Sequence, residues 1–158
     1  MATTRIALGI LRSPDGHVWI QRAKAPSLGR WALPGGRIEP GEEPLEAARR
    51  EVLEETELVV EGGLHLAILE EHFEDAAGTP LYVVEVHAVL FHDPGDAPVA
   101  ADGVSATHRG PVPPSPALEP DIRLAALEPG SGPHRITARV RADGDDLVVL
   151  AWAQAAIA

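Results

Sequence analysis

Apolar and polar residues alternate in a way that predicts strands at the beginning of the chain. Residues 6–11 form a short apolar run, and Ser13-Pro14-Asp15-Gly16 is typical of a turn. Residues 17–22 then alternate, with Val18 and Ile20 on one face. The two runs predict a β-hairpin. Residues 31–33 predict a short strand that leads into Pro34-Gly35-Gly36.

The clearest periodicity lies just after this glycine pair. Leu45, Ala48 and Val52 recur at helical spacing and therefore share one face. Pro44 suits the first turn of a helix, where its missing N–H costs nothing. We expect a helix from Pro44 to about Thr56, with this apolar face packed on the core.

Strand patterns continue after the predicted helix. Residues 58–60, 64–73 and 81–91 predict three strands, and the last of these has its apolar positions on one face. Nine of the fifteen prolines then fall between Pro94 and Pro133. Because residues 93–120 have almost no periodicity, we expect a long irregular segment there.

The C-terminal part gives weaker patterns. Residues 122–127 are compatible with a strand, and residues 135–141 alternate with a period of two, which predicts another. Residues 146–158 fit either a strand or a closing helix capped by Asp145 or Asp146.

Composition narrows the class of protein. The length suits one domain over residues 1–158, within which residues 93–134 form a Pro/Gly-rich segment. No apolar run approaches the roughly 20 residues that cross a bilayer, so we expect no membrane partner. The absence of cysteine excludes disulfides and Cys-type zinc sites. With no signal-peptide core at the N-terminus, we expect a cytoplasmic protein.

Charge points away from nucleic acid and toward the middle of the chain. The formal net charge is −11, and residues 37–92 hold fourteen Asp/Glu against three Arg. A basic footprint for duplex nucleic acid is therefore missing. An acidic run is usually a solvated helix face, but here the spacing of the acids argues for more.

Three glutamates gather on one side of the predicted helix. Glu51, Glu54 and Glu55 are related by i, i+3 and i+4, so their side chains lie one turn apart. Such like charges repel by a few tenths of a kcal/mol per pair, and a helix that only needed solubility would interleave Lys or Arg. Mg2+ explains the group because it binds a few carboxylates together with substrate phosphate oxygens. It also positions a diphosphate and activates water, whose proton a nearby carboxylate can accept.

The loop before the helix fits the same chemistry. Gly35 and Gly36 lack a Cβ atom, which allows a sharp bend or a close approach to a ligand. Gly41 provides another turn. The loop can therefore carry the chain from strand to helix and bring Glu42 beside the helical carboxylates.

These residues together resemble a known family signature. Gly36, Glu42 and the run Arg50-Glu51-Val52-Leu53-Glu54-Glu55-Thr56-Glu57-Leu58 match eight of the nine specified positions of the Nudix box, G-x5-E-x7-R-E-U-x-E-E-x-G-U. The preceding Trp31-Ala32-Leu33-Pro34-Gly35-Gly36 is also typical of that family. The resemblance covers roughly residues 3–92. It implies an α+β fold, an α/β/α sandwich with a mixed β-sheet and the catalytic loop-helix after a strand.

The resemblance also implies roles for the box residues. Glu51, Glu54 and Glu55 resemble the metal-binding and catalytic carboxylates, and Gly36 would lend its backbone carbonyl to the metal or to the loop. Arg50 resembles the residue that orients a box glutamate through a salt bridge, and Glu42 resembles an accessory carboxylate. The general base is left open between Glu51, Glu54 and a residue elsewhere in the chain.

The implied function is hydrolysis of a nucleoside diphosphate linked to another moiety. The cofactor would be Mg2+, with Mn2+ as an alternative, and the substrate a nucleoside triphosphate or a nucleotide sugar such as ADP-ribose. The alternative is a nucleotide-binding or regulatory domain without turnover. A homodimer is left open.

One box position departs from the family pattern. Glu57 stands where the box has glycine, which suits the left-handed conformation that often ends a helix. A non-glycine residue there costs on the order of 1 kcal/mol. We expect the helix to end differently or Glu55 to be slightly displaced, with a modest loss of activity.

Three further residues are weaker expectations for substrate binding. Arg22 and Arg37 flank the loop and are expected to meet phosphates, although simple exposure to solvent is the alternative. For Trp31 a packing role in the core is the preferred interpretation, and stacking on a base in the substrate site is the alternative.

Overall fold

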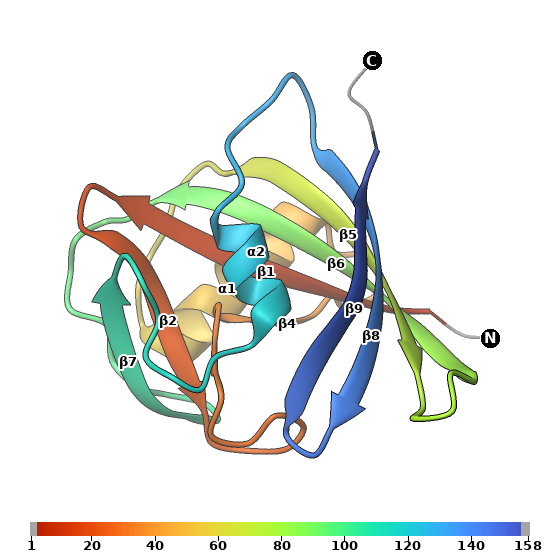
Figure 1. The fold of residues 1–158 in the computed structure, drawn as a ribbon. Helices are drawn as coiled ribbons and strands as arrows, with labels where there is room; N and C mark the ends of the chain where they lie inside the picture. The colour runs from red at the N-terminus through yellow and green to blue at the C-terminus, as the bar shows by residue number, and fades with distance from the viewer. Residues whose placement is uncertain (1–2, 156–158) are drawn as a thin grey trace.

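Residues 3–155, which the computed structural model describes, contain nine strands and two helices (Figure 1). Their bounds in chain order are β1 Thr4–Ser13, β2 Gly16–Arg22, β3 Trp31–Ala32, β4 Gly35–Arg37, α1 Pro44–Thr56, β5 Leu64–Glu74, β6 Pro80–His92, β7 Val104–Gly110, α2 Glu119–Ala125, β8 His134–Asp143 and β9 Asp146–Gln154. The strands form one mixed sheet in the order β3-β2-β1-β6-β5-β8-β9. In addition, β4 pairs with β1 and β7 pairs with β2.

The parallel pair of β1 and β6 forms the centre of the sheet. Ala7 and Leu11 of β1 pack on one face, while Leu8 and Ile10 pack on the other. Both faces are apolar because both are covered, as expected for a parallel pair at the centre of a sheet. The predicted hairpin is confirmed, since β1 and β2 pair antiparallel around the turn.

Helix α1 covers one face of this centre. Its buried Ala47, Ala48 and Val52 pack against Ala7, Leu11, Val89 and Phe91. Pro44 occupies the first turn, and the N–H of Glu43 donates to Oε1 of Glu46 at 3.2 Å, which satisfies one of the free donors at a helix start. The predicted bounds and packing face are both confirmed.

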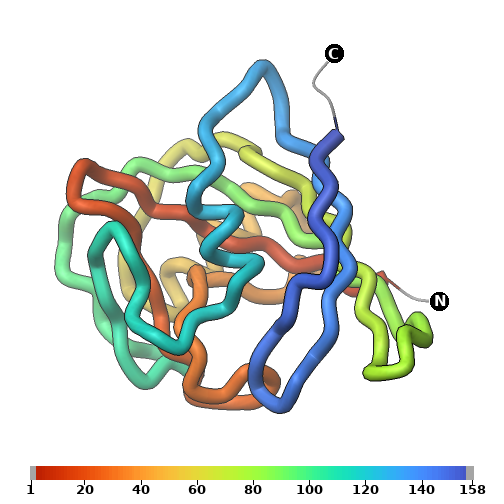
Figure 2. Tube along the Cα trace, in the orientation of Figure 1, coloured from red at the N-terminus to blue at the C-terminus, as the bar shows by residue number. Residues whose placement is uncertain are grey.

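Helix α2 lies on the opposite face of the sheet (Figure 1). Leu124 and Ala125 pack there with Leu8 and Ile10. Strands β8 and β9 curl toward the same side (Figure 2), and the guanidinium of Arg123 lies 5.2 Å from the ring centre of Trp152. The predicted α+β class with a mixed sheet is confirmed. No helix among the described residues is long and apolar enough to cross a membrane.

The predicted strand over residues 122–127 is wrong, because most of this segment belongs to α2. The buried residues Pro120, Asp121, Leu124 and Ala125 recur with helical spacing, and a proline stands in the first turn. The helix is only seven residues long. A short apolar run of this length does not distinguish a buried strand from a buried helix.

Two other expectations are corrected, and one alternative that the sequence left open is decided. The segment 93–120 is not irregular throughout, because residues 104–110 form β7 beside β2. Residues 58–60 form no strand; Leu58 and Val60 are buried beneath α1 without pairing in the sheet. Of the two alternatives at the C-terminal end, the strand is correct: β9 pairs antiparallel with β8, whose own prediction is confirmed. Residues 156–158 lie outside the described residues.

Candidate active site

The glycine pair brings the loop directly against the first glutamate of α1. Gly35 and Gly36 belong to β4 and pair with Leu8 and Ala7 of β1. A Cβ atom on Gly36 would lie 2.5 Å from the carboxyl carbon of Glu51, a distance that real Cβ atoms do not adopt. Neither glycine has a positive φ. The glycines are therefore required by close approach and not by an unusual turn.

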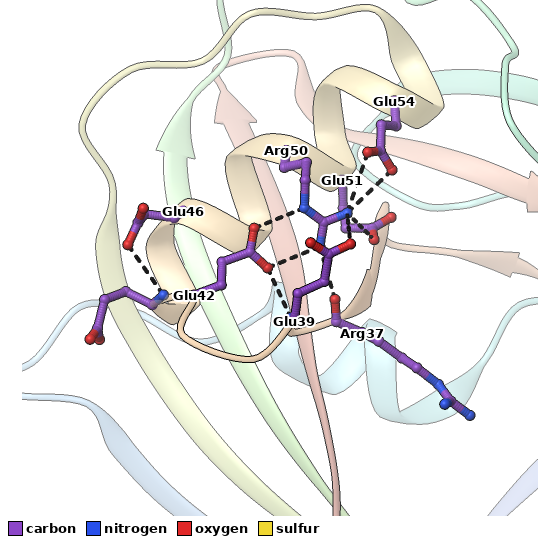
Figure 3. Close-up of polar contacts among 8 residues, drawn as sticks. Arg37, Glu39, Glu42, Glu46, Arg50, Glu51 and Glu54 are labelled. Atoms are coloured by element: carbon purple, nitrogen blue, oxygen red, sulfur yellow. Dashed lines mark hydrogen bonds and ion pairs between the residues drawn. The ribbon is translucent and has the colours of Figure 1, made fainter.

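Arg50 joins the loop to the helix at the centre of the acidic cluster (Figure 3). Its Nε and Nη2 donate to the two carboxylate oxygens of Glu42 at 2.8 and 3.0 Å. Its Nη1 donates to Glu51 at 2.9 Å and lies 3.3 Å from both carboxylate oxygens of Glu54. The Nη2 group also donates to the backbone carbonyl of Arg37 at 2.9 Å. One guanidinium thus holds Glu42, Glu51 and Glu54 together.

Two of the helical carboxyls have a raised pKa. Burial raises the pKa of Glu51, and the neighbouring charges of Glu54 and Asp102 add to the effect against the opposing influence of Arg50. Burial, followed by the charges of Glu51 and Asp102, raises the pKa of Glu55 to about 7. Oε1 of Glu55 accepts a hydrogen bond from the N–H of Gly35 at 2.7 Å. The site therefore concentrates negative charge, and a cation placed there would stabilise the ionised forms.

Asp102 acts on this cluster from the segment 93–120, in which the sequence patterns did not single it out. The N–H groups of Val99 and Ala101 donate to the carbonyls of Thr56 and Glu55 at the end of α1, at 2.9 and 3.1 Å. These bonds satisfy carbonyls that a helix end leaves free. Because the loop is tied to α1, the charge of Asp102 acts on Glu51 and Glu55.

The unusual Glu57 occupies the conformation that the family reserves for glycine. It has φ 59° and ψ 14°, in the left-handed region, and its N–H donates to the carbonyl of Leu53 at 2.9 Å. The expectation of a different helix end is wrong, since α1 ends at Thr56 with this cap. The chain instead accepts the conformational strain of a non-glycine residue there.

A cavity of about 510 Å³ opens beside the glycine pair. Gly35, Gly36, Arg22 and Arg37 line it, and most of its wall is apolar. Nε of Arg22 donates to the carbonyl of Pro26 at 2.7 Å, and the side chain of Arg37 points away from the acidic cluster (Figure 3). The two arginines therefore lie where the cavity and the loop meet.

Trp31 takes no part in this cavity. Its side chain is 9% exposed and packs in the core, with its ring edge-on to His108 at 6.2 Å between centroids. Of the two interpretations of Trp31, the structure therefore favours packing in the core over stacking on a base.

Two acids that the sequence patterns did not single out line the cavity instead. Glu71 of β5 and Asp121 of α2 both contribute to its wall, and they are only 5% and 7% exposed. The only sequence signal was a charged residue within one predicted strand, Glu71 in residues 64–73, and another directly before a second, Asp121 before residues 122–127.

The family to which the chain belongs follows from its sequence match. The model of the NUDIX domain family matches residues 2–109. The chain belongs to the NUDIX domain family. The predicted membership among Nudix hydrolases is therefore confirmed, and the match extends past the box to the end of β7.

Curated relatives of this Nudix chain carry different names. The 8-oxo-dGDP phosphatase NUDT18 of Mus musculus is 45% identical over 60 residues, 38% of this chain and 19% of its own. Diphosphoinositol polyphosphate phosphohydrolase 3-alpha of Homo sapiens is 41% identical over 61 residues, 39% of this chain and 37% of its own. An octanoyltransferase of Myxococcus xanthus is 33% identical over 103 residues, 63% of this chain and 27% of its own. The chain thus spans well under half the length of these relatives.

The Nudix fold itself is shared with solved structures over nearly the whole chain. A MutT protein of Bacillus halodurans has a TM-score of 0.76 and 19% sequence identity, and the alignment covers 96% of this chain and 97% of that one. The likeness therefore includes α2, β8 and β9, which lie beyond residue 109.

The carboxylates of the Nudix box are close together but are not arranged around one point. Within residues 3–155 no group of three or more His, Cys, Asp or Glu has a geometry suited to a metal ion. Arg50 donates hydrogen bonds to Glu51 and Glu54, while Glu55 accepts a hydrogen bond from the N–H of Gly35. In this structure the guanidinium supplies the positive charge that the acidic cluster requires.

Proposed function

We propose that this chain hydrolyses a nucleoside diphosphate linked to another moiety, with Mg2+ as the cofactor. The observation that carries the proposal is the close approach of the Gly35–Gly36 backbone to Glu51 and Glu55, beside a cavity of a size suited to a small molecule. The loop, the helical acids and the cavity together offer sites for a metal, a diphosphate and an organic group.

The donor set fits a hard divalent cation, which Nudix hydrolases generally use. Glu51, Glu54, Glu55 and the carbonyl of Gly36 offer only oxygen atoms, the ligands that Mg2+ prefers. Burial raises the pKa of Glu51 and Glu55, and negative neighbours add to the effect, so a cation there would stabilise their ionised forms. When bound to these residues, the metal would supply positive charge for the diphosphate and make water more acidic.

The remaining polar residues would orient this set. Arg50 ties Glu42 of the loop to Glu51 and Glu54 of the helix, so it would fix the side-chain directions of the ligands. The N–H of Gly35 would hold the carboxyl of Glu55. Arg22 and Arg37, at the mouth of the cavity, would contact phosphate oxygens because guanidinium groups pair well with them.

Two carboxylates are the strongest choices for the proton acceptor. Glu54 is 41% exposed at its side chain, which leaves it open to water. Asp102 lies in the loop before β7, is exposed as well, and has a charge that acts on Glu51. Glu54 would accept the proton from within the proposed ligand set, whereas Asp102 would accept it as a nearby carboxylate outside that set.

The proposed substrate is a nucleotide, either a nucleoside triphosphate or a nucleotide sugar such as ADP-ribose. The apolar wall of the cavity supports this choice because it fits a flat organic ring. The name of one relative, 8-oxo-dGDP phosphatase, supports the same class.

The test is hydrolysis by the purified chain with Mg2+, against nucleoside triphosphates, ADP-ribose and dinucleoside polyphosphates. We expect Glu54→Gln to lower the rate by about 10²-fold or more. The rate of hydrolysis by Asp102→Asn tests Asp102 as the second proton acceptor. Glu61→Gln, an exposed change outside the box, is the matched control and should leave the rate unchanged.

Two results would contradict the proposal in different ways. If Glu54→Gln and Asp102→Asn both kept the full rate, the assigned acids would be wrong. If no substrate turned over while nucleotides bound in a Mg2+-dependent way, the chain would be a nucleotide-binding or regulatory domain.

A further inference from the structure

The cavity beside the Nudix box contains a pair of acids that the hydrolytic machinery does not use. Glu71 of β5 and Asp121 of α2 both line this cavity. Apolar side chains form much of the rest of the cavity wall, among them Ile6, Leu8, Leu33, Leu69, Val84 and Val86. Carboxyls are rarely placed in such surroundings without a partner, because burying a charge is costly.

The two acids differ in their hydrogen bonding. Oδ2 of Asp121 accepts a bond from the N–H of Leu33 at 2.9 Å, so its ionised form has a donor. Glu71 is 5% exposed and makes no hydrogen bond or ion pair with another residue in the part of the chain that the structure describes. Its carboxyl lines the cavity, where a ligand could supply the missing partner.

The environment gives the acids opposite protonation states near neutral pH. Burial and the charge of Asp121 raise the pKa of Glu71 to about 8. Burial raises the pKa of Asp121 to about 6, against the opposing influences of Leu33 and Arg22. At pH 7 Glu71 therefore carries a proton that it can donate, while Asp121 is an acceptor.

Few other ionisable groups face the pair. Arg22 of β2, Arg37 of β4 and Tyr82 of β6 also line the cavity, and the side chain of Arg37 points away from the acidic cluster of the box (Figure 3). Strand β1 contributes Thr4, Ile6 and Leu8 to the wall, and the β8–β9 hairpin contributes Ala142, Gly144 and Leu147. None of these side chains is ionisable. Arg22 and Arg37 are thus the cationic side chains among the residues that line the cavity, and the charge of Arg22 also acts on Asp121.

We infer that Glu71 and Asp121 recognise the polar edge of a nucleobase, with Glu71 donating to a ring nitrogen or carbonyl and Asp121 accepting from a neighbouring N–H. This rests on the proposed function and names the part of the substrate that the cavity takes. A neutral aromatic ring fits an apolar cavity, and its edge supplies the partner that Glu71 lacks. The phosphates would extend toward Arg22, Arg37 and the box.

The same pair argues against a polyphosphorylated inositol as the occupant. Such a ligand carries negative charge all around its ring, so the part of it that Arg22 and Arg37 do not neutralise would meet an ionised Asp121 in a mostly apolar wall. Of the ligand types in the relatives' names, the cavity therefore favours the oxidised nucleotide over the diphosphoinositol polyphosphate.

The test measures equilibrium binding with metal chelated, so that hydrolysis plays no part. Adenosine, guanosine and cytidine 5′-monophosphates are titrated into the purified chain at pH 7.0 and 8.5, with ribose 5-phosphate and inositol hexakisphosphate as probes without a base. We expect at least one nucleotide to bind more than tenfold tighter than either probe. Loss of the Glu71 proton should weaken its binding about fourfold between pH 7.0 and 8.5.

Variants separate hydrogen bonding from simple packing. Glu71→Gln keeps an N–H donor at every pH, so binding at pH 7.0 should stay within about twofold and the fourfold pH dependence should disappear. Glu71→Leu should bind more than tenfold more weakly. Glu70→Gln, an exposed change at the neighbouring position of β5, should behave like the unchanged chain. Thermal unfolding of each variant checks that the fold is kept.

The inference is overturned if Glu71→Gln retains the pH dependence, if Glu71→Leu binds normally, or if inositol hexakisphosphate binds as tightly as the nucleotides. These outcomes are separate from those of the hydrolysis test. A chain that binds as described and hydrolyses nothing would sink only the proposed function. Hydrolysis with unchanged binding in both Glu71 variants would sink only the inference.

Discussion

The acidic residues of the box and those of the cavity are the same kind of group in opposite surroundings. In the box, Glu42, Glu51 and Glu54 share one arginine and face water or the loop. In the cavity, Glu71 and Asp121 lie in an apolar wall where no arginine contacts them. The box thus gives three of its carboxylates a shared counter-charge, whereas burial in the cavity keeps the carboxyl of Glu71 neutral up to a pKa of about 8. If the surroundings of these acids differ in this way, substitutions in the box and in the cavity should have different effects.

Removal of Arg50 should have the largest effect, because it removes the counter-charge of three carboxylates at once. We expect Arg50→Ala to lower hydrolysis by about 10²- to 10³-fold and the free energy of unfolding by about 2 kcal/mol. Steady-state kinetics and urea denaturation measure the two effects. Arg49→Ala is the matched control, since Arg49 is exposed and bonds only the carbonyl of Gly62. Equal kinetics for the two variants would remove Arg50 from the site.

Neutralisation of Glu71 should change stability in a manner that depends on pH. Its folded-state pKa of about 8 lies above the ordinary value of 4.5. The folded chain therefore holds a proton that the unfolded chain has lost, and stability falls as pH rises from about 4.5 through 8. We expect Glu71→Gln to raise the free energy of unfolding on the order of 3 kcal/mol at pH 9 and hardly at all at pH 4.5.

Urea denaturation at several pH values measures this difference. The Glu70→Gln control is exposed and should show no such rise. A gain from Glu71→Gln that was the same at every pH would mean that Glu71 is not protonated in the folded chain, and the contrast between cavity and box would fail.

A Cβ atom on Gly36 should disturb the box without affecting the cavity acids. Because that atom would lie 2.5 Å from the carboxyl carbon of Glu51, Gly36→Ala must displace the carboxylate or the loop. Misplacement of about 1 Å costs roughly 10²-fold in rate, which kinetic measurement would detect. Gly132→Ala is the control, since it meets no atom within 4 Å and its φ is not positive. An active Gly36→Ala chain would show that Glu51 has no fixed position in the reaction.

The sequence predicted the box far better than the cavity, for a physical reason. Residues of the box lie within 23 positions of one another, and their spacing on a strand, loop and helix follows from local periodicity. The bounds of α1 and the pairing of β1 with β2 followed from the same local patterns.

The cavity was not predictable in this way because its parts meet only through the tertiary fold. Glu71 and Asp121 are 50 positions apart; Glu71 lay in a predicted strand and Asp121 directly before the segment 122–127, which was also expected to be a strand. Asp102 reaches the box only because the loop before β7 bonds to the end of α1. Helix α2 is short and lies in a proline-rich stretch, where local periodicity is weakest.

The smallest expected effect is at Glu57, at the exposed end of the box helix. Its left-handed conformation is unfavourable for a residue with a Cβ atom, so Glu57→Gly should relieve strain. Glycine also gains freedom in the unfolded chain, which leaves a net rise of roughly 0.5–1 kcal/mol in the free energy of unfolding. Glu57→Ala removes the charge but keeps the Cβ atom, so it should gain much less. Equal gains from alanine and glycine would assign the effect to charge at the helix end. The strain would then not be what distinguishes this box from the family pattern.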